Sequence, residues 1–178
     1  MATEWLYAAT AEHFVISSSR LLIRPLAEQD LQLYLDLYTN TASMAFIGKP
    51  LLPEKAKHSF QIALGLNANT PFKRLFLTIV AHGQSAGLCA INQWNSETAE
   101  VEVGIMLLRP WHGKGYAREA LAALIQRVQL HFQGAVIKGD LDPKNKAAVQ
   151  LVVKTGFQPD LICPRTYWVK HNDALVPF

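Results

Sequence analysis

The chain has 178 residues, of which 50% are hydrophobic and 17% charged, a composition that excludes a disordered chain and predicts one domain with a substantial core. Its formal net charge of +3 is small and its basic residues are scattered, which excludes the concentrated basic surface of a nucleic-acid-binding protein. No apolar run reaches the ~18 residues that a membrane-spanning helix needs, so no membrane partner is expected.

The start of the chain shows little periodicity, and we expect an N-terminal extension, residues 1–19, packed on a single domain, residues 20–178. A short apolar run, 13–16, is a candidate strand. Two acidic residues and no basic one precede this run, which argues against a signal peptide. Cys89 and Cys163 lie far apart without metal-ligand spacing, so we interpret them as reduced thiols of a cytoplasmic protein without a metal.

The first half of the domain reads as one strand and two helices. The strand covers 20–25 and is ended by proline, and apolar residues at helical spacing then predict a helix over about 28–38. The next segment, 40–52, has no sustained period: it is either a surface loop with buried apolar anchors or a loop that binds a substrate. Pro53 suits the first turn of the following helix, which carries one apolar face: Ala56, Phe60, Ala63 and Leu64.

The second half alternates strands with helices. Three strands separated by turn residues form an antiparallel meander: 75–81, 86–94 and 99–109. The helix 116–132 then presents a core-facing stripe: Ala117, Leu121, Leu124, Val128 and Phe132. A strand, a helix and a hairpin follow: 135–140, 145–155, 157–163 and 165–170. We therefore predict a mixed α/β fold with a largely antiparallel sheet of about six to seven strands, flanked by about four helices.

The sequence His112-Gly113-Lys114-Gly115-Tyr116-Ala117 joins the third meander strand to the long helix. Glycines allow a ligand to approach the backbone, and the helix start directs unpaired N–H groups and a positive dipole end at it, which suits a diphosphate. Lys114 and Arg118 add positive charge. An ordinary strand-to-helix loop has the same two glycines, and neither GxxxxGK[ST] nor GxGxxG is present.

This sequence resembles the coenzyme-A signature [Q/R]-x-x-G-x-[G/A] of the Gcn5-related N-acetyltransferases (GNAT), read here as His112-x-x-Gly115-x-Ala117. The flanks agree: Glu102-Val103-Gly104, Ala117-Arg118-Glu119-Ala120-Leu121, Asn145 and Lys154-Thr155-Gly156-Phe157. Within the superfamily the chain is most similar to RimJ/RimL-type enzymes that acetylate ribosomal-protein N-termini. The resemblance covers roughly 20–170 and implies a sheet that splays between the fourth and fifth predicted strands, where the pantetheine arm enters.

The resemblance also assigns the residues that bind acetyl-CoA. Pantetheine is expected along the end of the third meander strand, diphosphate at the glycine turn, and the thiol end near Asn145, which is also a candidate helix cap. The full set is Met106, Leu107, Leu108, His112, Gly113, Lys114, Gly115, Tyr116, Ala117, Arg118 and Asn145. The strand residues are equally compatible with a role in the core. His112 departs from the usual Gln or Arg: it acts through its backbone, or its ring reaches phosphate and makes affinity pH-dependent.

Glu102 is the candidate general base, with Glu100 in reserve. Both share one face of a strand with Gly104 and Met106, so the alternative is a solvated strand face. The general acid for the leaving thiolate is not visible, because Ala148 and Val152 stand where family members carry serine or tyrosine. Two other phenols match no motif position: Tyr116 and Tyr167.

These observations and the resemblance predict a cytoplasmic enzyme, monomeric or homodimeric, that transfers acetyl from acetyl-CoA directly to a primary amine in a ternary complex. The expected acceptor is a protein or peptide N-terminus, with 40–52 as its binding loop. A small-molecule amine, such as a polyamine, aminoglycoside or amino acid, is the alternative substrate. A non-catalytic acyl-CoA-binding module is the alternative of another class.

Overall fold

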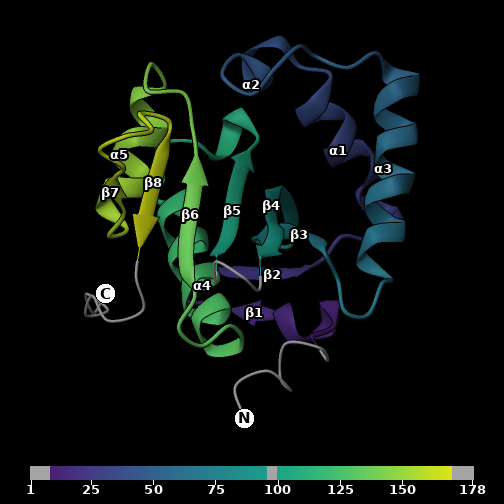
Figure 1. Ribbon diagram of the computed structural model, residues 1–178. Helices are drawn as coiled ribbons and strands as arrows, with labels where there is room; N and C mark the ends of the chain where they lie inside the picture. The colour runs from purple at the N-terminus through teal and green to yellow at the C-terminus, as the bar shows by residue number, and fades with distance from the viewer. Residues whose placement is uncertain (1–8, 96–99, 170–178) are drawn as a thin grey trace.

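The computed structural model describes residues 9–95 and 100–169, and within them it shows a mixed α/β fold with one eight-stranded, mostly antiparallel sheet (Figure 1). The strands lie in the order β1-β2-β3-β4-β5-β6-β8-β7. Their bounds are β1 (Ile16–Ser17), β2 (Leu21–Pro25), β3 (Arg74–Ala81), β4 (Gln84–Asn95), β5 (Glu100–Leu107), β6 (Val136–Asp140), β7 (Gln158–Pro159) and β8 (Thr166–Val169).

Five α-helices and three short 3-10 helices accompany the sheet in the described part of the chain. The α-helices are α1 (Leu31–Tyr38), α2 (Thr41–Met44), α3 (Pro53–Asn67), α4 (Tyr116–His131) and α5 (Lys146–Lys154). The 3-10 helices are η2 (Ala11–Phe14), η3 (Glu28–Asp30) and η4 (Arg109–Trp111). None of the helices among these residues is long and apolar enough to cross a membrane.

The predicted fold class and element order are confirmed, with three local differences. The candidate strand 13–16 is instead the end of η2 followed by β1, which adds an eighth strand. The segment 40–52 contains the additional helix α2. The first strand of the last hairpin ends at Pro159, because the Asp160 carboxylate accepts the amides of Ile162 and Cys163, both at 2.7 Å, and turns the chain.

All neighbouring strands are antiparallel except β5 and β6, which pair in parallel at only three positions, from Glu100↔Val136 to Glu102↔Lys138. On its other side β5 remains paired with β4 up to Leu107, opposite Gly87. The two strands therefore lie side by side at one end and diverge after Glu102, as the resemblance implied (Figure 1).

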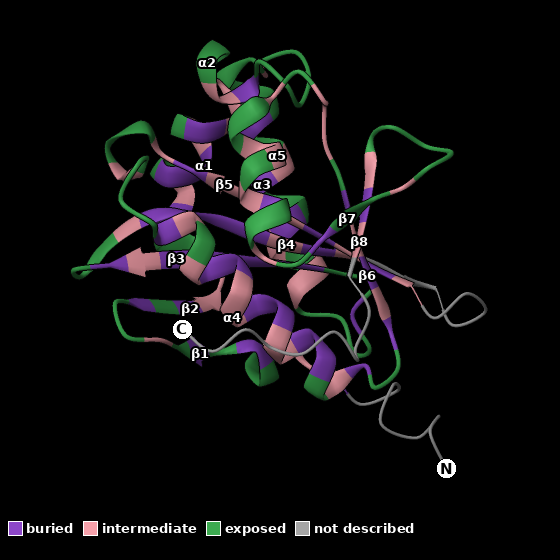
Figure 2. Ribbon diagram, turned by 90° about the vertical axis from the view of Figure 1, so that its left-hand side faces the viewer, coloured by how far each residue is buried: buried purple, intermediate pink, exposed green. Residues whose placement is uncertain are grey.

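The sheet separates two hydrophobic clusters, and buried residues concentrate where helices meet strands (Figure 2). The larger cluster joins α4 to β5 and β6 and includes four of the five predicted stripe residues: Leu121, Leu124, Val128 and Phe132, while Ala117 is partly exposed. The smaller cluster joins α1 and α3 to the other face and includes Leu37, Phe60, Phe76 and Leu88. Phe14 of the N-terminal segment is fully buried against Phe72 and Phe132, whereas residues 1–8 of the predicted extension lie outside the described residues.

Asp30 ties β2, β3 and the start of α1 together. It is 1% exposed and receives two bonds from the Arg24 guanidinium, at 2.6 and 2.9 Å, and one from Thr78 Oγ1 at 2.8 Å. The amide of Ala27 donates a further bond at 2.9 Å. Burial alone raises the pKa of Asp30, but these hydrogen bonds and the Arg24 charge outweigh it, so the pKa lies below its ordinary value.

We expect Asp30→Asn to lower the free energy of unfolding at neutral pH by about 2–4 kcal/mol, because Arg24 loses its charged partner. Because the folded-state pKa is depressed, the carboxylate stabilises the protein above the unfolded-state pKa of about 4, and this contribution is lost as pH falls through the folded-state pKa. Urea denaturation should therefore show a smaller difference between the two proteins at about pH 3 than at neutral pH.

The exposed Glu54–Lys57 pair on α3 provides the control. Glu54→Gln should change the free energy of unfolding by less than about 0.5 kcal/mol. An Asp30→Asn effect that is the same at both pH values would contradict the role assigned to the ionised carboxylate.

Candidate active site

A cavity of about 540 Å³ lies beside the end of β5 that β6 leaves unpaired. Four segments form its wall, and the second and third of them follow each other directly in the sequence. They are the 40–52 segment (Ala42, Ser43, Phe46, Ile47), the end of β5 (Ile105, Met106, Leu107), the stretch from η4 into α4 (Arg109, Trp111, His112, Gly113, Gly115, Tyr116, Ala117, Arg118) and α5 with its cap (Asn145, Ala147, Ala148, Leu151).

The end of β5 offers main-chain hydrogen-bonding groups to this cavity. The amide of Leu108 donates to the carbonyl of Ala86 at 2.9 Å, so the even-numbered residues of β5 direct their amides and carbonyls toward β4. The odd-numbered residues direct theirs the other way, where β6 pairs only as far as Glu102. The amides of Ile105 and Leu107, both cavity residues, therefore suit an extended ligand that contains amide groups.

The glycine turn, residues 112–115, owes its shape to two glycines with left-handed backbone angles, φ 73° at Gly113 and 83° at Gly115. Gly115 is the N-cap of α4, so the first-turn amides of the helix open beside it, and residues 116–118 line the cavity. Arg109 and Arg118 contribute positive charge, and none of the cavity residues is an Asp or Glu. The combination of helix dipole, open amides and cations favours an anion.

The structure brings together most, but not all, of the predicted cofactor residues. Nine line the cavity: Met106, Leu107, His112, Gly113, Gly115, Tyr116, Ala117, Arg118 and Asn145. Leu108 instead packs in the cluster between the sheet and α1–α3. Lys114 also lies outside the cavity wall, with its ammonium 5.6 Å from the centre of the Trp111 ring.

Two of these side chains also have structural roles. His112 Nε2 donates to the carbonyl of Leu107 at 2.9 Å, because a carbonyl can only accept, and this bond holds the ring against the end of β5. The Asn145 side-chain oxygen accepts the Ala148 amide at 3.1 Å and caps α5. Asn145 thus combines the two alternatives considered for it, a helix cap and a residue of the cavity wall.

The two candidate carboxylates have different environments. Glu100 forms an ion pair with Lys138 at 3.2 Å. Glu102 makes no ion pair with a residue that the structure describes; its Oε1 accepts from Asn92 Nδ2 at 3.3 Å. The Nδ2 of Asn92 faces Glu102, because the Oδ1 of Asn92 and the carboxylate oxygens of Glu102 can both only accept. The Asn92 Oδ1 is then buried without a hydrogen-bond partner among the residues that the structure describes.

Glu102 is not part of the cavity wall, and it lies four residues before Met106, which is. Glu102, Gly104 and Met106 share one face of β5, and a Cβ added at Gly104 would meet nothing within 4 Å. The residue opposite Gly104 on β4 is Ala90, which is also small. The floor between Met106 and Glu102 is therefore free of side chains longer than a methyl group.

Several cavity residues were not predicted from the sequence. The 40–52 segment contributes Phe46 and Ile47, both partly exposed, whereas Met44 is its buried anchor. One signal for the local turn was present, since Asn40 caps α2 by accepting the amides of Ala42 and Ser43, at 2.9 and 3.0 Å. Ile105 could have been found from strand alternation, because it lies two residues before Leu107.

The described residues do not supply a conventional acid at the positions where the family's acids are expected. Ala148 lines the cavity without a hydroxyl, and Val152 is buried in α5. The Tyr116 hydroxyl is bonded to His82 Nε2 at 2.7 Å, and Tyr167 is buried in β8. Within the described ranges, no group of three or more His, Cys, Asp or Glu side chains could hold a metal ion.

Comparison with known proteins yields one family and a set of similar folds. The family model described as an acetyltransferase (GNAT) domain matches residues 20–158. No curated protein sequence matches the chain.

Three solved structures illustrate the similarity of fold. The RimL ribosomal L7/L12 alpha-N-protein acetyltransferase in complex with coenzyme A is 15% identical, with a TM-score of 0.74 over 88% of this chain and 97% of that one. The spermidine N-acetyltransferase from Vibrio cholerae, with CoA and spermine, is 18% identical, with a TM-score of 0.73 over 86% and 96%. An acetyltransferase from Agrobacterium tumefaciens is 24% identical, with a TM-score of 0.73 over 87% and 93%.

Proposed function

Because the chain belongs to the GNAT family of acetyltransferases, we propose that it acetylates the amine at a protein or peptide N-terminus, by direct transfer in a ternary complex. Family membership makes the protein an acetyl-CoA-dependent N-acetyltransferase, and the acceptor class is our proposal. The main support is the cavity that runs from the glycine turn along β5 to the 40–52 segment, since residues expected to bind the cofactor and residues of the candidate acceptor loop line the same wall.

The residues present fit acetyl-CoA in three places. The diphosphate suits the amides at the start of α4, with Arg118 beside them. The amide groups of the pantetheine arm suit the outward-facing backbone of Ile105 and Leu107. Asn145 has its oxygen committed to the helix cap, so its Nδ2 remains to donate toward the thioester end.

Transfer requires a neutral amine, and N-terminal amines are largely protonated at neutral pH. In the proposed reaction Glu102 takes a proton from the amine, directly or through a water over Gly104, while nitrogen bonds to the thioester carbon. The carbon–sulfur bond then breaks, and the sulfur leaves with its electron pair and takes the second proton that the nitrogen loses, yielding the amide and coenzyme A. Asn92 holds the Glu102 carboxylate in place through its Nδ2.

Electrostatics favour a singly charged peptide amine over a polyamine. The cavity wall carries two arginines and no carboxylate, and its outer part includes the apolar Phe46 and Ile47. A polyamine usually calls for several carboxylates to complement its charges. The similar folds include both a protein N-terminal and a spermidine acetyltransferase, so the similarity of fold supports either class, and the charge of the cavity is the support for the peptide amine.

The diphosphate assignment is tested at Gly115. A valine there would be strained at φ 83°, and its Cβ would lie 3.3 Å from Arg20 Nη2, so the turn must shift. We expect the Kd for coenzyme A, measured by calorimetry, to rise by about tenfold or more, because losing one or two charge-assisted hydrogen bonds weakens binding by about that factor.

Gly134, at the far end of α4, is a matched control because its φ is 79° and a Cβ there would meet nothing within 4 Å. Gly134→Val should show similar backbone strain and keep wild-type affinity for coenzyme A. Unchanged affinity in a folded Gly115→Val protein would remove the diphosphate from the glycine turn.

Glu102→Gln keeps the shape of the side chain and removes its basicity. We expect kcat/KM for the amine to fall roughly 10²–10⁴-fold, the usual contribution of general-base catalysis, with acetyl-CoA affinity nearly unchanged. Raising the pH should restore part of the activity, because more amine is then already neutral.

Glu100→Gln is the matched control, since Glu100 lies on the same strand face but is ion-paired with Lys138. It should retain most of the activity. If Glu100→Gln is the variant that loses activity, the base has been assigned to the wrong carboxylate; if neither loses it, the two carboxylates belong to a solvated strand face.

The acceptor class is tested by direct competition of substrates. Peptides that begin with Ser, Ala or Thr should have kcat/KM values at least about tenfold above that of spermidine, because the cavity lacks the carboxylates that a polycation requires. Thiol release from acetyl-CoA provides the measurement for every acceptor. A higher value for spermidine would replace the proposed acceptor class with polyamines.

A further inference from the structure

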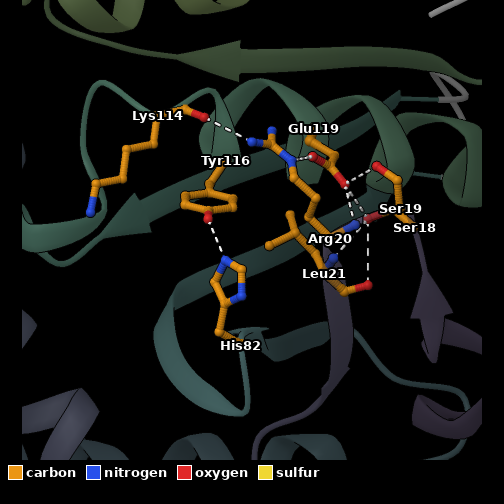
Figure 3. Close-up of polar contacts among 8 residues, drawn as sticks. All are labelled: Ser18, Ser19, Arg20, Leu21, His82, Lys114, Tyr116 and Glu119. Carbon is orange, nitrogen blue, oxygen red and sulfur yellow. Dashed lines mark hydrogen bonds and ion pairs between the residues drawn. The ribbon is translucent and has the colours of Figure 1, made fainter.

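The glycine turn is held from behind by Arg20, a residue that the proposed reaction does not use (Figure 3). Arg20 Nη1 donates to the carbonyl of Lys114 at 3.0 Å, and Nε donates to Glu119 Oε2 at 2.7 Å. The guanidinium also stacks on the Tyr116 ring, 4.5 Å from its centre. One side chain directly before β2 thus contacts the turn and the first turn of α4.

The bond to Lys114 determines where the next amide points. In a trans peptide the C=O of one residue and the N–H of the next lie on opposite sides of the bond. Since the Lys114 carbonyl faces Arg20, the Gly115 N–H faces away from it. Gly115 lines the cavity and Arg20 does not, so the Gly115 amide is directed toward the site of the anion.

Without this bond, little else in the backbone would favour that orientation. The peptide group joins Lys114 to Gly115, and its rotation changes ψ of Lys114 and φ of Gly115, of which the glycine rotates more easily than a residue with a side chain. If the peptide rotated, the Lys114 carbonyl oxygen would face the cavity in place of the amide. A negative oxygen dipole would then meet the negatively charged diphosphate.

Glu119 fixes the guanidinium in turn. Its carboxylate accepts from Ser18 Oγ at 2.8 Å, Ser19 Oγ at 3.0 Å and the Arg20 amide at 2.9 Å, in addition to Arg20 Nε. Burial raises the pKa of Glu119, but the bonds from Ser18, Arg20 and Ser19 outweigh it and hold the pKa below its ordinary value. The carboxylate therefore remains ionised and oriented toward Arg20.

Tyr116 contacts the Arg20 guanidinium on the side opposite Glu119. Its hydroxyl is bonded to His82 Nε2 at 2.7 Å, on the turn between β3 and β4 (Figure 3). Its ring meets Trp111 edge-on, with 5.5 Å between the ring centres. The residues on both sides of the glycine turn are thus anchored independently of Arg20. The Arg20–Lys114 bond is the contact that acts on the peptide inside the turn.

We propose that Arg20 is a positioning residue for the cofactor diphosphate: by holding the Lys114 carbonyl away from the cavity, it directs the Gly115 amide toward the phosphate oxygens. This role rests on the proposed binding of acetyl-CoA at the glycine turn. Arg20 acts through the backbone and does not itself contact the cofactor.

The central experiment compares two thioesters in Arg20→Gln. With acetyl-CoA, KM should rise by about tenfold or more while kcat at saturation stays near the wild-type value, because the loss affects only cofactor binding. With S-acetylpantetheine, which lacks the diphosphate, kcat/KM should be the same in the variant and the wild type. An equal loss with both thioesters, or a loss in kcat alone, would overturn the proposal.

Arg20→Lys separates geometry from charge. A lysine ammonium keeps the positive charge but cannot reproduce the rigid fork that binds the Lys114 carbonyl and Glu119 together. We expect Arg20→Lys to retain the raised KM for acetyl-CoA. If it restores the wild-type KM, charge alone explains the effect and the positioning role is wrong.

Arg24→Gln is the matched control, because Arg24 lies on β2, which follows Arg20 directly, and its replacement breaks a comparable ion pair, with Asp30, away from the glycine turn. It should lower the melting temperature but leave the KM for acetyl-CoA unchanged. If Arg20→Gln does not fold, Glu119→Gln provides the same test, with a smaller rise in KM for acetyl-CoA and none for S-acetylpantetheine.

The outcome distinguishes this proposal from the proposed function. If the wild-type protein transfers acetyl from neither thioester to any amine, the proposed function fails. If the wild type is active and Arg20→Gln binds acetyl-CoA normally, only the role of Arg20 fails.

Discussion

The short parallel pairing between β5 and β6 is the constraint from which the rest of the site follows. Parallel neighbours require a crossover connection, and α4 provides it, so the helix begins where β5 ends. Because the pairing stops after three positions, the end of β5 keeps main-chain groups that no strand covers. The opening in the sheet and the anion-binding end of the helix are consequently at the same place.

Elements with a sustained periodicity were predictable, and those decided by single contacts were not. The stripe of α4, the continuous apolar run of β3 and the alternation at the start of β5 are local patterns that tertiary packing reinforces. By contrast, β1 has only two residues, and α2 is a single turn set by the Asn40 side chain. The shortening of β7 depends on Asp160, whose carboxylate captures two amides that a strand would otherwise have used.

The same distinction applies to the site. The glycine turn was recognisable because the residue types that it needs are adjacent in the sequence. The side chains of Leu108 and Lys114 lie outside the cavity wall, the first packed toward α1 and α3 and the second in contact with Trp111. Arg20 lies 94 residues before Lys114, and no local pattern connects the two. Such contacts between distant segments could be identified only from the folded structure.

The proposed cofactor site consists largely of main-chain groups, and this has a consequence for how the enzyme can change over evolutionary time. The amides of Ile105, Leu107, Gly115 and the first turn of α4 would be present whatever side chains stood at most of these positions. Mutation can therefore replace much of the surrounding sequence before the binding geometry is lost. Proteins with fewer than one residue in five in common can then share this architecture, as the 15% and 18% identities among its structural neighbours illustrate.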